Sequence, residues 1–181
     1  RLTGPRAHGL IPTSSSFESL SPHKQVNAAP EPSRVPLVTL VRPPTVVPKW
    51  AHTTPICPPI GVAYVASAVR AAGYRVAIVD ALGEGVLETR AVDGRPGFLT
   101  RGLSIEELVR RIGHETTYVG LSCMFSHEWP MTRMVINEVR RALPNATIIA
   151  GGEHVTAIPD FSLTDCPALD YCVVGEGEET I

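Results

Sequence analysis

Apolar residues gather in five short runs along the chain, separated by polar or amphipathic stretches. The runs are nearly continuous in apolar and β-branched side chains, and they cover residues 35–41, 75–80, 118–123, 146–152 and 171–177. Strands that helices cover on both faces have this pattern, because neither side of such a strand meets water. We therefore predict five buried β-strands.

Helical patterns fill most of the intervals between these runs. Typical boundary signals mark two of the helices. The first helical segment has two prolines at its start and Gly73 near its end, and the second has the capping-box spacing of Ser104 and Glu107. The predicted helical segments are 58–74, 103–112, 129–145 and, less clearly marked, 156–168.

Strands that alternate with helices favour a parallel sheet with right-handed crossovers. The predicted fold class is α/β, a Rossmann-like (flavodoxin-like) three-layer sandwich with a five-stranded parallel sheet in the order 2-1-3-4-5. Such sheets bind ligands at the carboxyl ends of their strands. Two long connections, residues 42–59 and 82–103, emerge at that edge, and long loops in compact domains are usually functional or mobile.

The beginning of the chain differs in composition from the rest. Residues 1–34 are rich in proline, serine and other small polar residues and have no helical or strand period, so we expect a disordered tail or linker there. The domain is expected over residues 35–181. Because the chain starts without Met and without the apolar core of a signal peptide, we expect it to be a fragment.

Charge and composition exclude several classes of function. A net charge of −2 gives no electrostatic argument for nucleic acid or an anionic membrane, and no apolar run has the roughly 20 residues of a membrane span. The four cysteines contain no Cys-x-x-Cys pair, which argues against zinc or iron–sulfur sites built from this chain alone. We expect reduced thiols and a cytoplasmic protein.

Unusual residues follow the predicted strands at the ligand-binding edge. No Gly-x-Gly-x-x-Gly, P-loop or flavodoxin-type phosphate loop follows the first strand, and no phosphoacceptor Asp of a receiver domain ends the third. Glycine-rich strand ends predict instead a large ligand that lies close to the backbone. The candidate ligand-binding residues are Pro43, Pro44, Ser122, Cys123, Met124, Gly151, Gly152, Glu153, His154, Gly175, Glu176 and Gly177.

Four stretches together resemble the cobalamin-binding domain that precedes the catalytic barrel of cobalamin-dependent radical S-adenosylmethionine (SAM) enzymes. They read "PPIGVAYVASAVRAAGYRVAIVDA", "YVGLSCMFSHEWP", "IIAGGEHVTAIPD" and "DYCVVGEGEETI", and the resemblance covers residues 35–181. The family's usual Gly-Gly-Pro-His reads Gly-Gly-Glu-His here, with Glu153 in place of proline. The family's Gly-Glu-Gly-Glu matches Gly175 to Glu178.

The resemblance implies a module that holds cobalamin over the strand ends, with the nucleotide tail between the sheet and a helix. It assigns the tail channel to Ser122 and Cys123, close approach of the backbone to Gly151, Gly152, Gly175 and Gly177, a hydrogen bond to His154, and a cover over one corrin face to residues 43–59. The motif Asp-x-His-x-x-Gly, which supplies a lower axial histidine in other cobalamin proteins, is absent. Base-off cobalamin is therefore expected, with water or nothing below the cobalt, or with a side chain such as His127 or His52 there.

The resemblance also implies what the parent enzyme does. Its C-terminal radical SAM barrel, with a [4Fe–4S] cluster and SAM, would follow Ile181 and is the expected partner of this chain. The parent would be a methyltransferase that acts on an unreactive carbon or phosphorus centre, while this chain alone would bind cobalamin without turnover.

Two other interpretations stay open at the level of sequence. One is a stand-alone α/β binding or regulatory module without corrinoid, in which the glycines serve turn geometry only. The other is a small enzyme that pairs Cys123 with His127 or His154 as thiol and imidazole. Cobalamin retention and cysteine reactivity distinguish the three.

Overall fold

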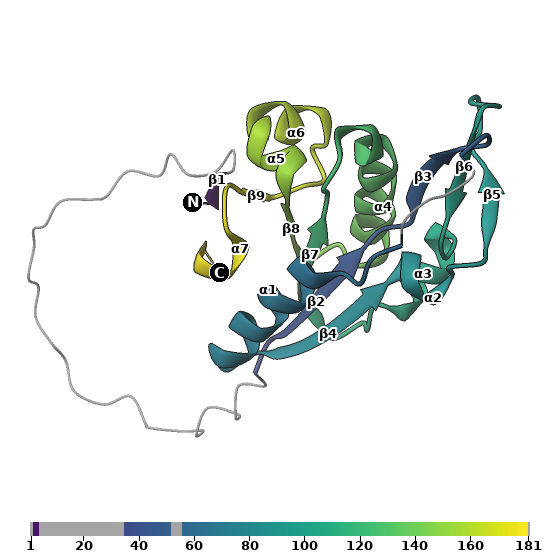
Figure 1. The fold of residues 1–181 in the computed structure, drawn as a ribbon. Coiled ribbons are helices and arrows are strands. Elements are labelled where there is room, and N and C mark those ends of the chain that lie inside the picture. Colours follow the sequence, from purple (N-terminus) through teal and green to yellow (C-terminus); the bar gives the residue numbers. More distant parts are fainter. Residues whose placement is uncertain (1, 4–34, 52–55, 181) are drawn as a thin grey trace, which may run out of the picture.

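The computed structural model describes residues 2–3, 35–51 and 56–180, which form a three-layer α/β fold (Figure 1). The central sheet contains five parallel strands, in space in the order β4-β2-β7-β8-β9, which is the predicted order 2-1-3-4-5. The fold class and the strand order are confirmed. The bounds of these strands are β2 (Leu37–Arg42), β4 (Arg75–Asp80), β7 (Thr116–Ser122), β8 (Thr147–Gly151) and β9 (Tyr171–Val173).

The sheet differs from the prediction at its β9 edge. A sixth strand, β1 (Leu2–Thr3), pairs antiparallel with β9, although these two residues belong to the expected tail. The remainder of that tail, residues 4–34, lies outside the described residues. The predicted fifth strand is too long: the chain leaves the sheet after Val173, turns at Gly175 with a φ of 84°, and enters α7 (Gly177–Thr180).

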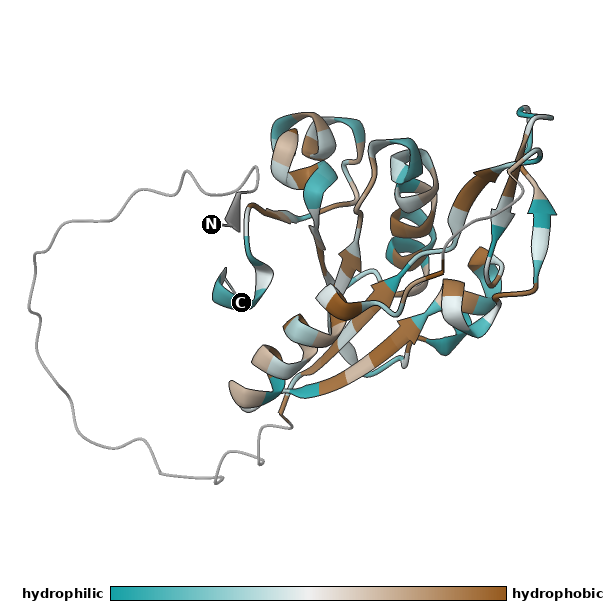
Figure 2. Ribbon diagram, in the orientation of Figure 1, coloured by the Kyte–Doolittle hydropathy of each residue, from teal (hydrophilic) through white to brown (hydrophobic). Residues whose placement is uncertain are grey.

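Helices cover the two faces of the sheet unequally. One face packs a large core against several helices: α3 (Ile105–Arg111), α4 (Trp129–Ala142), α5 (Glu153–Ala157) and α6 (Pro159–Asp165). On the opposite face, α1 (Ile60–Ala71) packs Val62, Ala66 and Val69 against Val38 and Leu40 of β2. The short α7 lies beside α1. Figure 2 shows the strands of the central sheet mainly in the colours of apolar residues. β2 is buried along almost its whole length, but β4 lies at the edge and buries only Val79, so the prediction of a buried strand is wrong there.

Local sequence signals explain where the helices begin and end. In α3, the Ser104 hydroxyl accepts from the Glu107 amide at 3.2 Å and the Glu107 carboxylate accepts from the Ser104 amide at 2.9 Å, which confirms the capping box. Gly73, with a φ of 92°, follows the end of α1. The segment 156–168 forms parts of two helices, because Pro159 begins α6. No helix in the described ranges has the length and apolar character of a membrane span.

The two long connections, which were predicted as loops, contain the strands of a second sheet. β3 (Thr45–Pro48), β6 (Phe98–Arg101) and β5 (Thr89–Ala91) pair antiparallel in the order β3-β6-β5, and the sheet projects beside α3 and α4 (Figure 1). The four-residue α2 (Ala81–Glu84) precedes it. One connection therefore orders against the other.

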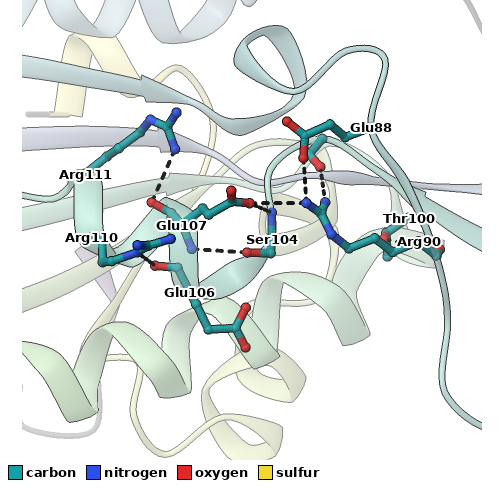
Figure 3. A network of polar contacts seen from close by, with 9 residues as sticks. Glu88, Arg90, Thr100, Ser104, Glu106, Glu107, Arg110 and Arg111 are labelled. Atoms are coloured by element: carbon teal, nitrogen blue, oxygen red, sulfur yellow. Dashed lines mark hydrogen bonds and ion pairs between the residues drawn. The ribbon is translucent and has the colours of Figure 1, made fainter.

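A polar network fastens this small sheet to the start of α3 (Figure 3). The guanidinium of Arg90 in β5 donates to the Gly102 carbonyl at 2.7 Å and to the Glu107 carboxylate at 3.2 Å, and it also pairs with Glu88. The Ser104 amide and then the Ser104 hydroxyl lower the pKa of Glu107, against an opposing effect of burial, and the charge of Arg90 lowers it by a smaller amount. Arg90 thus joins a capping carboxylate of α3 to the antiparallel strands.

Candidate functional site

The carboxyl ends of the parallel strands border two adjoining cavities. The first has a volume of about 440 Å³ and lies between β2, β7, β8 and β9 on one side and α1 and α7 on the other. Its apolar lining includes Leu40, Val65, Leu121, Ile149 and Val173. This space remains open because α1 and the four-residue α7 cover less of this face than four helices cover of the other.

The second cavity has a volume of about 670 Å³ and lies between β3, the segment that leads into α1, and the loop after β7. Prolines form much of its wall: Pro43, Pro44, Pro48, Pro58 and Pro59. Four residues line both cavities, namely Gly61, Val62, Ser122 and Met124. The cavities therefore adjoin across the start of α1 and the end of β7.

The structure brings most of the candidate residues to these cavities. The first cavity is lined by Ser122, Met124, Gly151, Gly152, Glu153, Gly175, Glu176 and Gly177. Pro43 and Pro44 line the second cavity. Cys123 and His154 line neither, because both are buried in the core. The edge of the sheet is thus a single recess, with two of the twelve candidates beneath its surface.

The structure explains why glycine occupies position 152. Its φ is 109°, and a Cβ added there would come 2.5 Å from the Cys123 carbonyl oxygen. At Gly151, an added Cβ would make only an ordinary contact, 3.8 Å from Cβ of Val173. The second glycine therefore lets the turn after β8 approach the end of β7.

Two other glycines face open space. A Cβ added at Gly61 or Gly175 would have no heavy atom within 4 Å. Gly61 is exposed on the first turn of α1 and borders both cavities, yet it was missed among the candidate residues. The available signal was a glycine inside a helical pattern, where it costs about 1 kcal/mol relative to alanine and often has a packing or functional reason.

The rim of the first cavity is acidic. Glu153, Glu176 and Glu178 line it, and its lining contains no lysine or arginine. This arrangement disfavours a polyanionic ligand such as a pyrophosphate and favours a ligand that donates hydrogen bonds to carboxylates.

Cys123 has the properties of a core residue. Its side chain is fully buried, and its Sγ lies 3.9 Å from the Phe125 carbonyl oxygen. Burial raises the pKa of the thiol to about 11, which outweighs a lowering hydrogen bond from Thr132. The thiolate that a nucleophile requires is therefore disfavoured, and the pairing with His127 or His154 as catalytic thiol and imidazole gains no support.

The three histidines considered from the sequence have different surroundings. His154 is 3% exposed, and its Nδ1 lies 3.0 Å from the Ser126 hydroxyl. His127 is exposed in the wall of the second cavity, where it stacks on Phe125 with ring centroids 5.6 Å apart. His52 lies outside the described residues. Among the described residues, no group of three or more His, Cys, Asp or Glu side chains is placed to hold a metal ion.

Comparison with known proteins gives the site a ligand class. Residues 50–181 match the B12 binding domain family. The chain is 33% identical over 155 residues to cytidylyl-2-hydroxyethylphosphonate methyltransferase of Streptomyces wedmorensis, an alignment that covers 83% of this chain and 28% of that protein. It is 29% identical over 149 residues to an uncharacterized methyltransferase of Pyrococcus horikoshii, covering 81% of this chain and 28% of that protein.

The chain thus spans about a quarter of the length of these curated relatives. The family match extends over most of the chain and includes α1 and the strand ends from β4 to β9, whereas the cavity walls formed by residues 40–48 precede it. This chain belongs to the B12 binding domain family.

Proposed function

We propose that this chain is the cobalamin-holding module of a cobalamin-dependent radical SAM methyltransferase. The observation that carries the proposal is the pair of adjoining cavities at the carboxyl ends of the strands, in a member of the B12 binding domain family. Both relatives named above are methyltransferases and are much longer than this chain. Their additional length has room for a C-terminal barrel that would hold a [4Fe–4S] cluster and SAM.

The residues of the recess fit cobalamin. Bare backbone at Gly61 and Gly175 leaves open space that a side chain would fill, as a large ligand requires. The apolar lining of the first cavity suits the aromatic base of the nucleotide tail. The glutamates at its rim can accept hydrogen bonds from cobalamin amides and hydroxyls. Residues that line both cavities, such as Ser122 and Met124, would contact both parts of the cofactor.

Cobalamin, when bound, supplies a cobalt centre that carries a methyl group from donor to acceptor. The corrin ring brings the nitrogen ligands of this cobalt, so the part of the chain is to bind and orient the cofactor. His127 is the described histidine in the wall of the second cavity, and it would be the side chain available there to help hold the cofactor. Cys123 and His154, by contrast, would act only through the residues that they hold.

The name of the Streptomyces relative specifies methylation of a cytidylyl-2-hydroxyethylphosphonate. We propose that the parent protein methylates an unreactive carbon or phosphorus centre. The four cysteines of the chain are free, in agreement with a reducing cytoplasm.

Two experiments test this proposal at its two levels. The purified chain, mixed with hydroxocobalamin and desalted, should retain the corrinoid and show its visible spectrum. The parent protein, reconstituted anaerobically with iron and sulfide, should show cluster absorbance and convert SAM to S-adenosylhomocysteine and 5′-deoxyadenosine when substrate is present. If the longer parent protein also retains no corrinoid, the result would support the alternative, an α/β binding or regulatory module without a corrinoid.

A further inference from the structure

His154 connects two loops that border the recess, although it lies beneath the surface. Its backbone amide donates to the Cys123 carbonyl at 3.3 Å, and its Nδ1 lies 3.0 Å from the Ser126 hydroxyl. These contacts join the start of α5 to residues 122–128, which are the last residue of β7 and the loop after it, with a 3₁₀ turn over Ser126–Glu128. Ser126 and His154 are 28 residues apart in the sequence.

The imidazole ring is fixed from its other side by Trp129, the first residue of α4. The two rings stack with centroids 4.8 Å apart and an angle of 29° between their planes. Trp129 is itself held, because its Nε1 donates to the Asp165 carboxylate at 2.8 Å. Arg133 pairs with the same carboxylate at 2.8 Å. The ring of His154 therefore has a supported orientation.

The ring nitrogens are not equally satisfied. Among the described residues, Nε2 of His154 is buried and has no hydrogen-bond partner. A buried N–H without an acceptor is rarer in proteins than an unused lone pair. The favoured tautomer therefore carries its proton on Nδ1 and donates it to the Ser126 hydroxyl. His154 then acts as a directional clamp on the loop.

The loop that His154 holds forms much of the recess wall. Ser122 and Met124 line both cavities, and Phe125, His127 and Glu128 line the second. Met124 is 50% exposed and Phe125 57%, so their own packing does little to fix the loop. Besides the buried Cys123 near its start, its position depends on the hydrogen bonds at its two ends and on the clamp at Ser126.

We propose that His154 is a positioning residue, which holds residues 122–128 in the shape that accepts cobalamin through its hydrogen bond to Ser126. This inference rests on the proposed function for its consequence, but the clamp itself is a property of the cofactor-free chain. The two parts are therefore tested by separate measurements.

The first measurement is hydrogen exchange of the cofactor-free chain by NMR. His154→Phe keeps a ring on Trp129 and removes the hydrogen bond, and Ser126→Ala removes it from the other side. Loss of one hydrogen bond, about 1 kcal/mol, should speed exchange of the loop amides about fivefold in each variant. The matched control is Ser162→Ala in α6, which removes a buried serine hydrogen bond to the Ile158 carbonyl, outside both cavities. Unchanged loop exchange in His154→Phe and Ser126→Ala would overturn the clamp.

The second measurement is the affinity for hydroxocobalamin of the same chain. Each single variant should bind about fivefold more weakly than the wild type, and the double variant should be no weaker than either, because both remove one interaction. Ser162→Ala should bind as the wild type does. Unaltered affinity in the single variants, or losses that multiply in the double variant, would overturn the positioning role. If the wild type itself binds no hydroxocobalamin, the proposed function fails, and hydrogen exchange still decides whether the clamp exists.

Discussion

The carbonyl group of Cys123 lies directly against the α-carbon of Gly152, so that any side chain at this glycine would collide with it at 2.5 Å. The Cys123 amide donates to the Gly151 carbonyl at 2.8 Å, and the Cys123 carbonyl accepts from the His154 amide. The ends of β7 and β8 are thus locked together where the recess begins. The Gly-Gly-Glu-His sequence allows this close packing of the two strand ends. The packing in turn shapes the recess.

We predict that Gly152→Ala destabilises the fold by more than about 2 kcal/mol, because a positive φ and a backbone collision act together. Urea unfolding of the wild type and of Gly152→Ala measures the difference in the free energy of unfolding. Gly151→Ala is the matched control and should cost less than about 1 kcal/mol, since its Cβ would meet only Val173 at 3.8 Å. Equal effects of the two substitutions would contradict the assigned packing role.

Acidification should weaken the fold through His154. Burial lowers the pKa of His154 from its ordinary value of 6.5. The unfolded chain therefore binds a proton at a higher pH than the folded chain does, and stability present above about pH 6.5 is lost as the pH falls. The free energy of unfolding of the wild type, relative to that of His154→Phe, should decrease between about pH 7.5 and about pH 5.5. A relative stability that does not change with pH would contradict a neutral buried imidazole.

Arg90→Met should loosen the small antiparallel sheet without unfolding the domain. The substitution removes the bonds to Gly102 and Glu107 and keeps much of the apolar stem. Because Arg90 is 39% exposed in its side chain, we expect a local cost of about 1 kcal/mol, which is about fivefold faster amide exchange in β5 and β6. Arg95→Met, at an exposed turn between these strands, is the control and should leave exchange unchanged.

The cysteines should differ sharply in reactivity. Cys57 is exposed, whereas Cys123, Cys166 and Cys172 are buried, and burial raises the pKa of Cys123 and of Cys172 to about 11. Alkylation of the native chain near neutral pH, read by peptide mass spectrometry, should modify Cys57 rapidly and the other three only after unfolding. Rapid modification of Cys123 would revive the interpretation as a thiol enzyme.

The parallel sheet was predictable because each strand carries its own signal. The runs 75–80 and 118–123 are nearly continuous in apolar residues, although β4 lies at the edge of the sheet and buries only Val79. Alternation with helices restricts how such strands connect. The capping box at Ser104 likewise depends on residues three apart. Signals of this kind involve residues close together in the chain, so they can be recognised in a single sequence.

The small sheet and the role of His154 depend on partners far along the chain. β5 has three residues and β6 four, too few to show an alternating pattern, and β3 lies about 50 residues before β6. His154 was assigned to the ligand because its motif lies at a strand end, whereas Ser126 and Trp129 direct its ring into the core. Cys123 was misplaced for the same reason, since the turn at Gly152 covers it.

The most direct test of the account compares retention of hydroxocobalamin by three proteins: the wild type, Gly61→Leu and Ala63→Leu. Both substitutions place a leucine in the first turn of α1, but only Gly61 borders the cavities, and its Cβ would point into open space without strain. We predict that the wild type and Ala63→Leu retain the corrinoid and that Gly61→Leu binds it at least about tenfold more weakly at unchanged stability. Equal retention by Gly61→Leu and the wild type would show that cobalamin does not occupy this recess.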